Sequence, residues 1–555
     1  MRTRNRPAGR PWLLLMALSL AACGSPSATG IGTGGPPAAP GSVTAASVAA
    51  SATQAQTVPP TQEPTPRIAG SADLVAYQSG RGGSWFSVPL GELPGTSEQA
   101  AASYAIGSTP LANRAGGQVS PTLAASYVFL QFDHVTVADL EKHIGTMRAL
   151  FIRSALMSFV DYRDGRVLGW DGRSISIPLD VRGFVRVCNQ HNVPVFLEIN
   201  YSDYVAGKVG TGIGSLVRTD NIAGTIAYLD DLGRDGLHVD GVTFGDEIGD
   251  DNGWGDRKPT LANSDLVGRF IAYATALRKH QPNLEIYAFD SSIGAASGEL
   301  DQYWEPLSRI RAAEQGSGLK LLDGFAFRES YVYIDAHGNL RPSQEILDDT
   351  ESLYRDAPVY RYDTDGSTGS NPDRDYLHTL MAKTAEIFGR RIDIALTEYL
   401  PAGPVQISES DTTRYADIDF ILHYADVLGI YSQLGLDEVS TFAFANSAQQ
   451  SKAYLDRYGG HGPNYPVRAQ LAQYLAGEML TVSGSAGYDT MKVKVYAFGS
   501  GGGYFVMILN KDATAAHAVR VTLSGQLDLT LELPSRSYTS LIVGDKGVTV
   551  SGIGA

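Results

Sequence analysis

Short apolar segments alternate with helical segments about eight times between Ser120 and Asn446, and this alternation restricts the possible fold most strongly. Several of the apolar segments lack polar residues almost entirely, as expected of parallel strands that are covered on both faces. The strand-like segments are residues 127–132, 155–162, 193–200, 241–245, 284–290, 324–327, 392–397 and 439–444. Between two of them, residues 264–280 show the periodicity of a helix with one apolar face.

This pattern predicts an α/β fold, a (β/α)8 TIM barrel over residues 120–470. A doubly wound open sheet is the alternative. No glycine-rich phosphate loop follows an early strand, which argues against a nucleotide-binding version of that sheet.

The chain after residue 470 changes to a period of two. Apolar and polar residues alternate around Val493, around Val521 and from Leu527 to Leu533, and a glycine-rich turn lies at residues 499–503. Such alternation is typical of antiparallel strands with one buried face. We therefore expect a small antiparallel β-sandwich domain over residues 471–555. Residues 71–119 contain a strand-like stretch, residues 72–89, which would add a strand to that sandwich.

The N-terminus has the features of an export signal. Arginines precede an apolar run, residues 12–20, that is too short to span a bilayer, and Leu20-Ala21-Ala22-Cys23 follows. This tetrad resembles the lipobox of bacterial lipoproteins, which implies a signal peptide at residues 1–23 and a lipid on Cys23; a plain secretory signal is the alternative. Residues 24–70, rich in Ala, Pro, Ser and Thr, are expected to be a disordered linker. The expected location is the bacterial cell envelope, lipid-anchored or secreted outside the cytoplasmic membrane.

Charge and cysteine content exclude further classes. The formal net charge of −15 argues against a nucleic-acid partner, which would require a basic face. Cys188 is the one cysteine besides Cys23, so a lipidated Cys23 leaves no intrachain disulfide. Cys188 falls in a predicted helix, residues 180–192, where we expect a buried, inert thiol. We expect a monomer.

Two predicted strands end in glutamate. Val242-Thr243-Phe244-Gly245-Asp246-Glu247 ends the fourth strand, and Ile394-Ala395-Leu396-Thr397-Glu398 ends the seventh. Strand ends of this kind face the active site of a barrel. Two carboxylates across a cleft, about 5–5.5 Å apart, are what retaining cleavage of a glycosidic bond requires. The simpler interpretation is that each glutamate only favours the start of a following helix.

Residues 226–249, Leu396-Thr397-Glu398-Tyr399 and Leu509-Asn510-Lys511-Asp512 carry a family resemblance. Residues 120–550 resemble the clan A retaining glycoside hydrolases that carry a C-terminal β-sandwich. The resemblance implies that Glu247 is the acid/base and Glu398 the nucleophile. It also implies a polysaccharide or oligosaccharide substrate, with β-linked bonds expected, and no cofactor.

One position departs from the family pattern. Asp246 stands where the clan usually has Asn, and a carboxylate cannot donate a hydrogen bond unless it is protonated. Its charge would raise the pKa of Glu247, which suits a general acid. The departure supports an alternative, a catalytically inactive carbohydrate-binding surface lipoprotein. A polysaccharide lyase is a third class, and it would need a Tyr, His or Lys base instead of two opposed glutamates.

Polar and aromatic residues at or beyond other strand ends are candidate sugar contacts, or else loop residues and caps. They are Asn200, Tyr201, Asp246, Asp290, Glu329, Tyr331, Tyr399, Asn446 and Trp254. No His-Glu-x-x-His, Cys-x-x-Cys or Gly-x-Ser-x-Gly motif is present. The acidic residues 246–256 do not have the spacing of a helix–loop–helix calcium site. We therefore expect no metal.

Overall fold

The chain divides into two units, Met1–Ile68 and Ala69–Ala555, and all residues described below belong to the second. The structure is a computed structural model. It describes residues 85–90, 100, 102–110, 122–126, 138, 141, 151–154, 160–161, 166–167, 181–199, 222–244, 266–292, 301–330, 342–349, 361–362, 368–369, 376–400, 417–441, 467, 470, 478–484, 492–500, 503–523 and 526–554.

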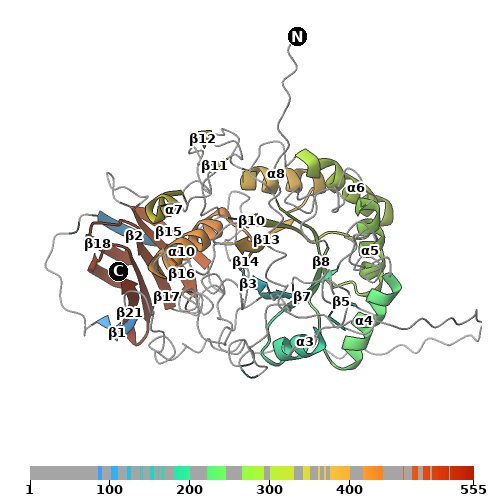
Figure 1. Ribbon diagram of the computed structural model, residues 1–555, viewed down its shortest axis with the longest axis horizontal. Helices are drawn as coiled ribbons and strands as arrows, with labels where there is room; N and C mark the ends of the chain where they lie inside the picture. The colour runs from blue at the N-terminus through green and yellow to red at the C-terminus, as the bar shows by residue number, and fades with distance from the viewer. Residues whose placement is uncertain are drawn as a thin grey trace, which may run out of the picture. The chain divides into compact units, whose positions relative to one another are not determined.

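Eight strands close into a barrel in which every neighbouring pair is parallel (Figure 1). In chain order they are β3 (Thr122–Ser126), β4 (Phe151–Ser154), β7 (Val195–Ile199), β8 (Gly241–Phe244), β9 (Glu285–Ser292), β10 (Gly324–Ser330), β13 (Asp393–Leu400) and β14 (Glu438–Thr441). Because β14 pairs with β3, this sheet has no free edge, whereas an open sheet would have two. The predicted mixed α/β fold is confirmed.

Helices cover the outside of the barrel strands (Figure 1). They are α3 (Val181–Gln190), α4 (Ile222–Arg234), α5 (Leu266–His280), α6 (Asp301–Ser317), α8 (Tyr376–Phe388) and α10 (Asp417–Leu434). The shorter α7 (Ser343–Asp349) packs against α10. In α5, Phe270, Ala274 and Leu277 are fully buried at helical spacing, and the ring of Phe270 meets that of Phe244 on β8. These apolar stripes fix the helices against the sheet.

A separate small cluster identifies the inner face of the barrel. Phe196 on β7 and Tyr287 on β9 meet edge to face, 5.3 Å apart, and cluster with Ala326 and Ala395. A side chain on Gly241, in the strand between them, would lie 2.3 Å from the Phe196 ring. Large rings on some strands therefore fill the space left by small residues on others. The residues that alternate with these along the strands belong instead to the hydrophobic cluster that includes the helices.

The first two barrel strands lie earlier in the chain than the sequence predicts. The prediction placed them at residues 127–132 and 155–162, whereas β3 and β4 end at Ser126 and Ser154. Residues 160–161 form β5 (Val160–Asp161), which pairs with β6 (Arg166–Val167) outside the barrel. The reason is that the alanines of β3 contribute little hydrophobicity, so the aromatic residues after them dominate the pattern. Residues 127–132 lie outside the described residues.

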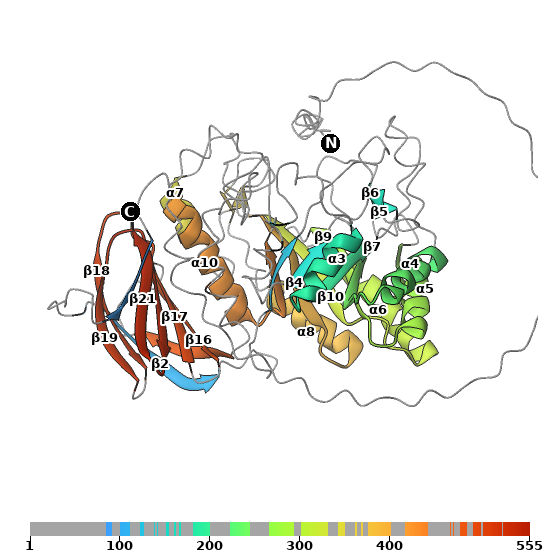
Figure 2. The same ribbon diagram turned by 90° about the horizontal axis from the view of Figure 1, so that it is seen from below.

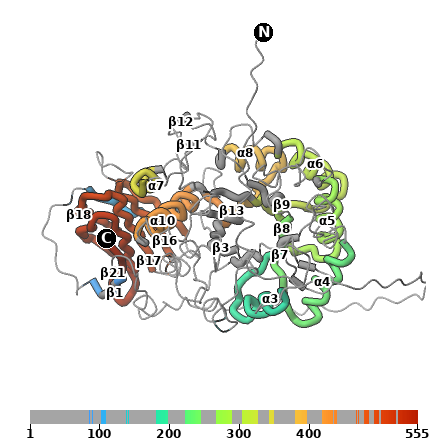
Figure 3. Tube along the Cα trace, in the orientation of Figure 1, coloured from blue at the N-terminus to red at the C-terminus, as the bar shows by residue number. Residues whose placement is uncertain are grey.

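A second sheet has nine strands in the order β1-β21-β20-β17-β16-β15-β2-β18-β19, all antiparallel except β2 with β18. They are β1 (Phe86–Pro89), β2 (Ala102–Pro110), β15 (Glu478–Gly484), β16 (Val493–Ser500), β17 (Gly503–Asn510), β18 (His517–Leu523), β19 (Leu527–Leu533), β20 (Ser537–Gly544) and β21 (Gly547–Gly554). The blue strands β1 and β2 thus lie among the red C-terminal strands (Figure 3). The predicted alternation is confirmed in β18, where Val519 and Val521 are buried and Arg520 is exposed.

This sheet folds over on itself. In the order of strands across the sheet, β19 lies six positions from β20. In a flat sheet the two strands would be about 29 Å apart, at ~4.8 Å per strand. Only residues 534–536 connect the two strands, and such a linker spans at most roughly 15 Å. The two halves must therefore face each other, and Val506 and Ile508 of one half share a cluster with Val519 and Val521 of the other.

The opposite face of one half packs against α10, which lies between that sheet and the barrel (Figure 2). Phe505 and Met507 of β17 belong to the same hydrophobic cluster as the barrel helices. All side chains of residues 418–432 are buried. An α-helix that is buried all round needs cover on both sides. The nine-stranded sheet provides the outer cover of α10.

Candidate active site

Polar residues follow the apolar part of three neighbouring barrel strands. They are Asp290-Ser291-Ser292 on β9, Arg328-Glu329-Ser330 on β10 and Thr397-Glu398-Tyr399 on β13. Because all barrel strands are parallel, their carboxyl ends lie at one face of the barrel, the face that carries the active site in enzymes of this architecture. These residues are therefore the candidate active site within the described part of the chain.

Strand β13 carries a β-bulge directly before Glu398. Phe327 of β10 pairs with Leu396, but the next residue, Arg328, pairs with Glu398, so Thr397 has no register partner on β10. On the other side, the register with β14 also shifts between Leu396 and Tyr399. Relative to both neighbours, β13 thus contains one extra residue. Such bulges occur next to active sites, where they redirect a side chain.

The bulge determines the face on which Glu398 lies. Ala395 belongs to the inner cluster of the barrel and Leu396 to the helix-facing cluster. Strict alternation would put Thr397 on the inner face and Glu398 on the outer one. The extra residue instead sets Glu398 beside Arg328, and Arg328 lies two residues beyond the inward Ala326. By backbone register, Glu398 is therefore on the inner face.

Strand β9 has a similar irregularity on the other side of β10. Phe325 pairs with Ala288 and Phe327 with Ser291, so Phe289 and Asp290 together lie opposite Ala326. Both neighbours of β10 are therefore one residue longer than β10 over this stretch. The second bulge includes Asp290, one of the predicted sugar contacts.

The structure describes the backbone of four of the predicted site residues. Glu398 and Tyr399 lie on β13, Asp290 on β9 and Glu329 on β10, within strands that run side by side. Glu329 was expected to follow its strand but lies inside it, paired with Tyr399. The other predicted residues lie outside the described residues; they are Glu247, Asp246, Asn200, Tyr201, Tyr331, Asn446, Trp254 and Cys23.

Two features at this face escaped the sequence-based prediction. The first is the pair of bulges, which cannot be predicted from one strand alone because a bulge is defined by the partner strand. The second is the place of Arg328 beside Glu398, which depends on the register between β10 and β13. The sequence signal for Arg328 was only its position at the end of an apolar run.

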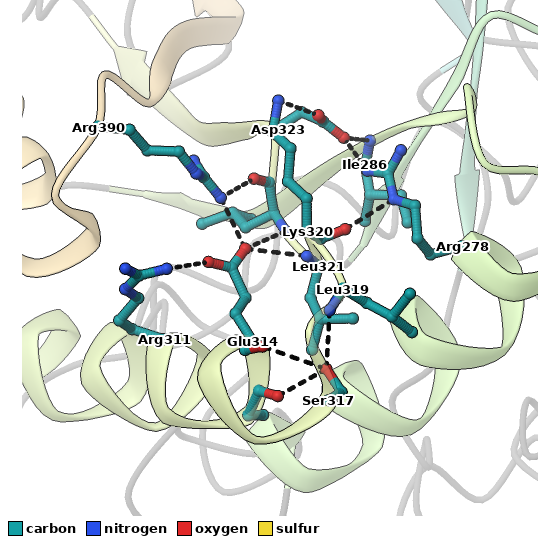
Figure 4. A network of polar contacts seen from close by, with 12 residues as sticks. Arg278, Ile286, Arg311, Glu314, Ser317, Leu319, Lys320, Leu321, Asp323 and Arg390 are labelled. Carbon is teal, nitrogen blue, oxygen red and sulfur yellow. Dashed lines mark hydrogen bonds and ion pairs between the residues drawn. The ribbon is translucent and has the colours of Figure 1, made fainter.

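The amino end of the barrel carries a buried polar network instead (Figure 4). Glu314 of α6 accepts a hydrogen bond from Arg390 at 2.6 Å and one from the backbone N–H of Leu321 at 2.9 Å. Arg278 donates to the carboxylate of Asp323, which also accepts from the N–H of Ile286. Each buried charge thus has partners, which is what structural stability requires. In enzymes of this architecture the amino end of the barrel serves stability, whereas chemistry is expected at the carboxyl end.

Two further carboxylates at the amino end, Asp393 and Asp437, have raised pKa values, and the largest cause for each is burial. Burial, together with the charge of Asp393, raises the pKa of Asp437 to about 6. The carboxylate of Asp437 accepts a hydrogen bond from the N–H of Ile394 at 2.9 Å. Asp437 therefore connects β14 to β13 and serves the barrel rather than the candidate active site.

Several classes of site find no support in the described part of the chain. No group of three His, Cys, Asp or Glu side chains there would hold a metal ion. Cys188 is fully buried in α3, and burial raises the pKa of its thiol, so the expected inert cysteine is confirmed. Among the helices described, none combines the length and the apolar character needed to cross a membrane.

No protein-family model and no curated protein matches the chain. Solved structures are similar in fold. A family 51 alpha-L-arabinofuranosidase from Bifidobacterium longum has a TM-score of 0.53 and 14% identity, over 82% of this chain and 99% of the other. A family 44 xyloglucanase from Paenibacillus polymyxa has a TM-score of 0.55 and 12% identity, over 81% and 99%.

A family 44 endoglucanase from Clostridium thermocellum is similar as well, with a TM-score of 0.54 and 13% identity over 82% of this chain and 99% of the other. At such identities the likeness concerns the fold alone. The chain therefore shares its fold with these three solved enzymes over about four fifths of its length.

Proposed function

We propose that the protein is a retaining glycoside hydrolase that cleaves O-glycosidic bonds of a β-linked polysaccharide or oligosaccharide. In this proposal the fold is a (β/α)8 barrel with a β-sandwich. The observation that carries the proposal is the bulge before Glu398, which gives a carboxylate-bearing residue a place on the inner face of the barrel at its carboxyl end. The fold shared with glycosidases of families 44 and 51 supports the same class.

The proposed reaction uses two glutamates. Glu398 attacks the anomeric carbon and forms a glycosyl ester, while Glu247 gives its proton to the departing oxygen. Glu247 then takes a proton from water, and the water oxygen displaces Glu398 and releases the sugar. Glu247 follows Phe244, the last residue of β8, by three positions and lies outside the described residues. No cofactor takes part.

The test compares wild type with Glu398→Gln on a panel of β-linked glycans and aryl glycosides. The matched control is Glu532→Gln, at an exposed strand position on β19. We expect hydrolysis by wild type and by the control, and a loss of turnover of at least about a thousandfold in Glu398→Gln. Equal turnover of all three proteins would remove Glu398 from the mechanism.

Glu247 needs a different test because an acid/base acts in both steps. Glu247→Gln is expected to retain formation of the glycosyl ester from aryl glycosides whose leaving groups need no proton. Attack of water on that ester should be slow, and added azide should restore turnover, because azide displaces Glu398 without general-base help and leaves as a glycosyl azide. If Glu247→Gln turns over these aryl glycosides at the wild-type rate without azide, Glu247 is not the acid/base.

A second candidate function is a carbohydrate-binding protein without turnover. Asp246, in place of the Asn that the resembled families carry, favours it. Glycan binding by wild type, measured by calorimetry, without product on any substrate of the panel would favour this alternative.

We also propose that the chain is a monomer anchored in the bacterial cell envelope through a lipid on Cys23. The motif Leu20-Ala21-Ala22-Cys23 supports the anchor. Cys23→Ser should move the protein from the membrane fraction to the soluble fraction and abolish labelling with radioactive palmitate. Membrane association that survives the substitution would refute the anchor. Light scattering of the detergent-solubilised protein tests the monomer.

A further inference from the structure

Three residues on neighbouring strands form one row at the carboxyl end of the barrel. Ser292 of β9 pairs with Arg328 of β10, and Arg328 pairs with Glu398 of β13. Register partners on parallel strands share a face, and neighbouring strands lie about 4.8 Å apart. The row therefore sets a guanidinium-bearing residue directly beside the proposed nucleophile.

We propose that Arg328 is a positioning residue that keeps Glu398 ionised. The inference rests on the proposed function of Glu398. Arginine stays charged at every pH at which such an enzyme works. A cation within about 4–6 Å of a carboxyl group lowers its pKa by roughly 1–3 units. The proposed nucleophile must be a carboxylate to attack, so this neighbour widens the active pH range on the acid side.

The composition of the surrounding strands supports this role for Arg328. Of the described residues of β9, β10, β13 and β14, Arg328 is the only cation. The acidic residues at this end of β10 and β9 are Glu329 and Asp290, and Glu329 alternates with Arg328 and so lies on the other face of the sheet. On β14, Ser440 and Thr441 at this end carry no charge. Arg328 is therefore the one positive charge that these strands place beside Glu398.

The bulge makes this juxtaposition specific. If β13 continued in regular register through Thr397, Thr397 would be the register partner of Arg328, and Glu398 would fall opposite Glu329. The extra residue thus exchanges an acidic partner for a basic one. A change in register of one residue determines which charge lies beside Glu398.

The experiment measures the pH dependence of kcat/KM for wild type, Arg328→Gln and Arg328→Lys, with the substrate that the glycan panel identifies. The acid limb of kcat/KM reports ionisation of the free nucleophile. We expect Arg328→Gln to move this limb up by at least about one pH unit, which is a tenfold loss on the limb. Arg328→Lys should move it less, because the ammonium keeps the charge without the planar shape. Arg520→Gln, at an exposed position on β18, should leave it unchanged.

The outcomes separate the two proposals. If wild type is active and folded Arg328→Gln has the same acid limb as wild type, the role of Arg328 is overturned and that of Glu398 stands. If Arg328→Gln does not fold, the neutral variant Arg328→Met decides, and a wild-type acid limb in that variant overturns the inference. A wild type inactive on every substrate overturns both proposals.

Discussion

The ammonium group of Lys511, just after β17, lies 2.7 Å from the carboxylate of Asp426 in the middle of α10, and neither side chain is exposed. Lys511 also donates to the carbonyl oxygen of Leu347 in α7 at 2.8 Å, and the hydroxyl of Tyr496 donates to Asp426. One buried ion pair thus connects the nine-stranded sheet to α10, and the same ammonium group reaches α7 through a hydrogen bond. Buried charges of this kind tolerate little loss of a partner.

We predict that Lys511→Met destabilises the protein by about 3–5 kcal/mol, because it leaves the Asp426 carboxylate buried without its cation. The double variant Lys511→Met with Asp426→Leu should recover a large part of that loss, since neither charge remains. The urea unfolding midpoints of the single and the double variant measure the loss of stability and its recovery. Arg520→Met, which removes an exposed pair with Asp528, is the control and should leave the midpoint almost unchanged. A wild-type midpoint in Lys511→Met would contradict this account of the interface.

Two glycines inside helices should respond to alanine in opposite directions. A side chain on Gly429 of α10 would lie 2.4 Å from the ring of Tyr496, whereas nothing lies within 4 Å of the corresponding position at Gly233 of α4. We expect Gly429→Ala to destabilise the protein by roughly 1–3 kcal/mol through overpacking. Gly233→Ala should instead stabilise it by up to about 1 kcal/mol, since alanine favours helices. Thermal unfolding of both variants is the measurement, and equal shifts would disprove the close approach at Gly429.

Lys494 on β16 should make stability depend on pH. Burial, with the charge of Lys511, lowers the pKa of Lys494 from 10.5 to about 7. Between pH 7 and 10.5 the unfolded chain binds a proton that the folded protein does not, so this residue makes stability rise with pH across that window. Below pH 7 both states are protonated and the full cost of burying the charge remains.

Lys494→Met should therefore stabilise the protein most below pH 7, and the gain should shrink towards pH 10. Urea unfolding at several pH values tests this. The control is Lys546→Met in the exposed turn between β20 and β21, which should show no such trend. A gain that is constant with pH would mean that packing rather than charge is responsible.

Exchange of Thr397 with Glu398 should abolish turnover. In the double variant Thr397→Glu with Glu398→Thr, the glutamate occupies the bulged position, which has no register partner on β10, and a threonine takes the place beside Arg328. We expect a loss of at least about a hundredfold, the scale seen when a catalytic group is misplaced. Thr397→Ala leaves Glu398 in its place, and it should stay within about tenfold of wild type. Rates of glycan hydrolysis and thermal unfolding are compared, and a folded exchange variant with wild-type turnover would refute the argument.

Periodicity predicted much of the fold because burial on both faces leaves a direct mark on the sequence. The prediction for residues 241–245, for example, differs by one residue from β8 (Gly241–Phe244). It failed at β3, where small alanines form the strand, and it did not recognise β2, whose Ala-Ser-Tyr-Ala-Ile sequence is small and half polar. Strands of small residues are recognised by their partners rather than by their own hydrophobicity.

The candidate active site shows the same limit. Glu398 stood out because it ends an apolar run. The sequence Leu396-Thr397-Glu398 does not contain the information that one residue is bulged, since that depends on where β10 aligns. For the same reason the pairing of Arg328 with Glu398 could not be predicted. Register between distant segments is a property of the folded sheet.

The position of β2 has a consequence for the order in which the protein folds during synthesis. Both neighbours of β2, the strands β15 and β18, are made only after the whole barrel has left the ribosome. The nascent chain must therefore keep its first strands unpaired while every barrel strand emerges, and α10 has no outer cover until β16, β17 and β20 follow. Such non-local pairing is slow and exposes intermediates to aggregation. A ribosome stalled after the barrel would hold an unfinished protein, because its final C-terminal strands close the part of the fold that its first strands begin.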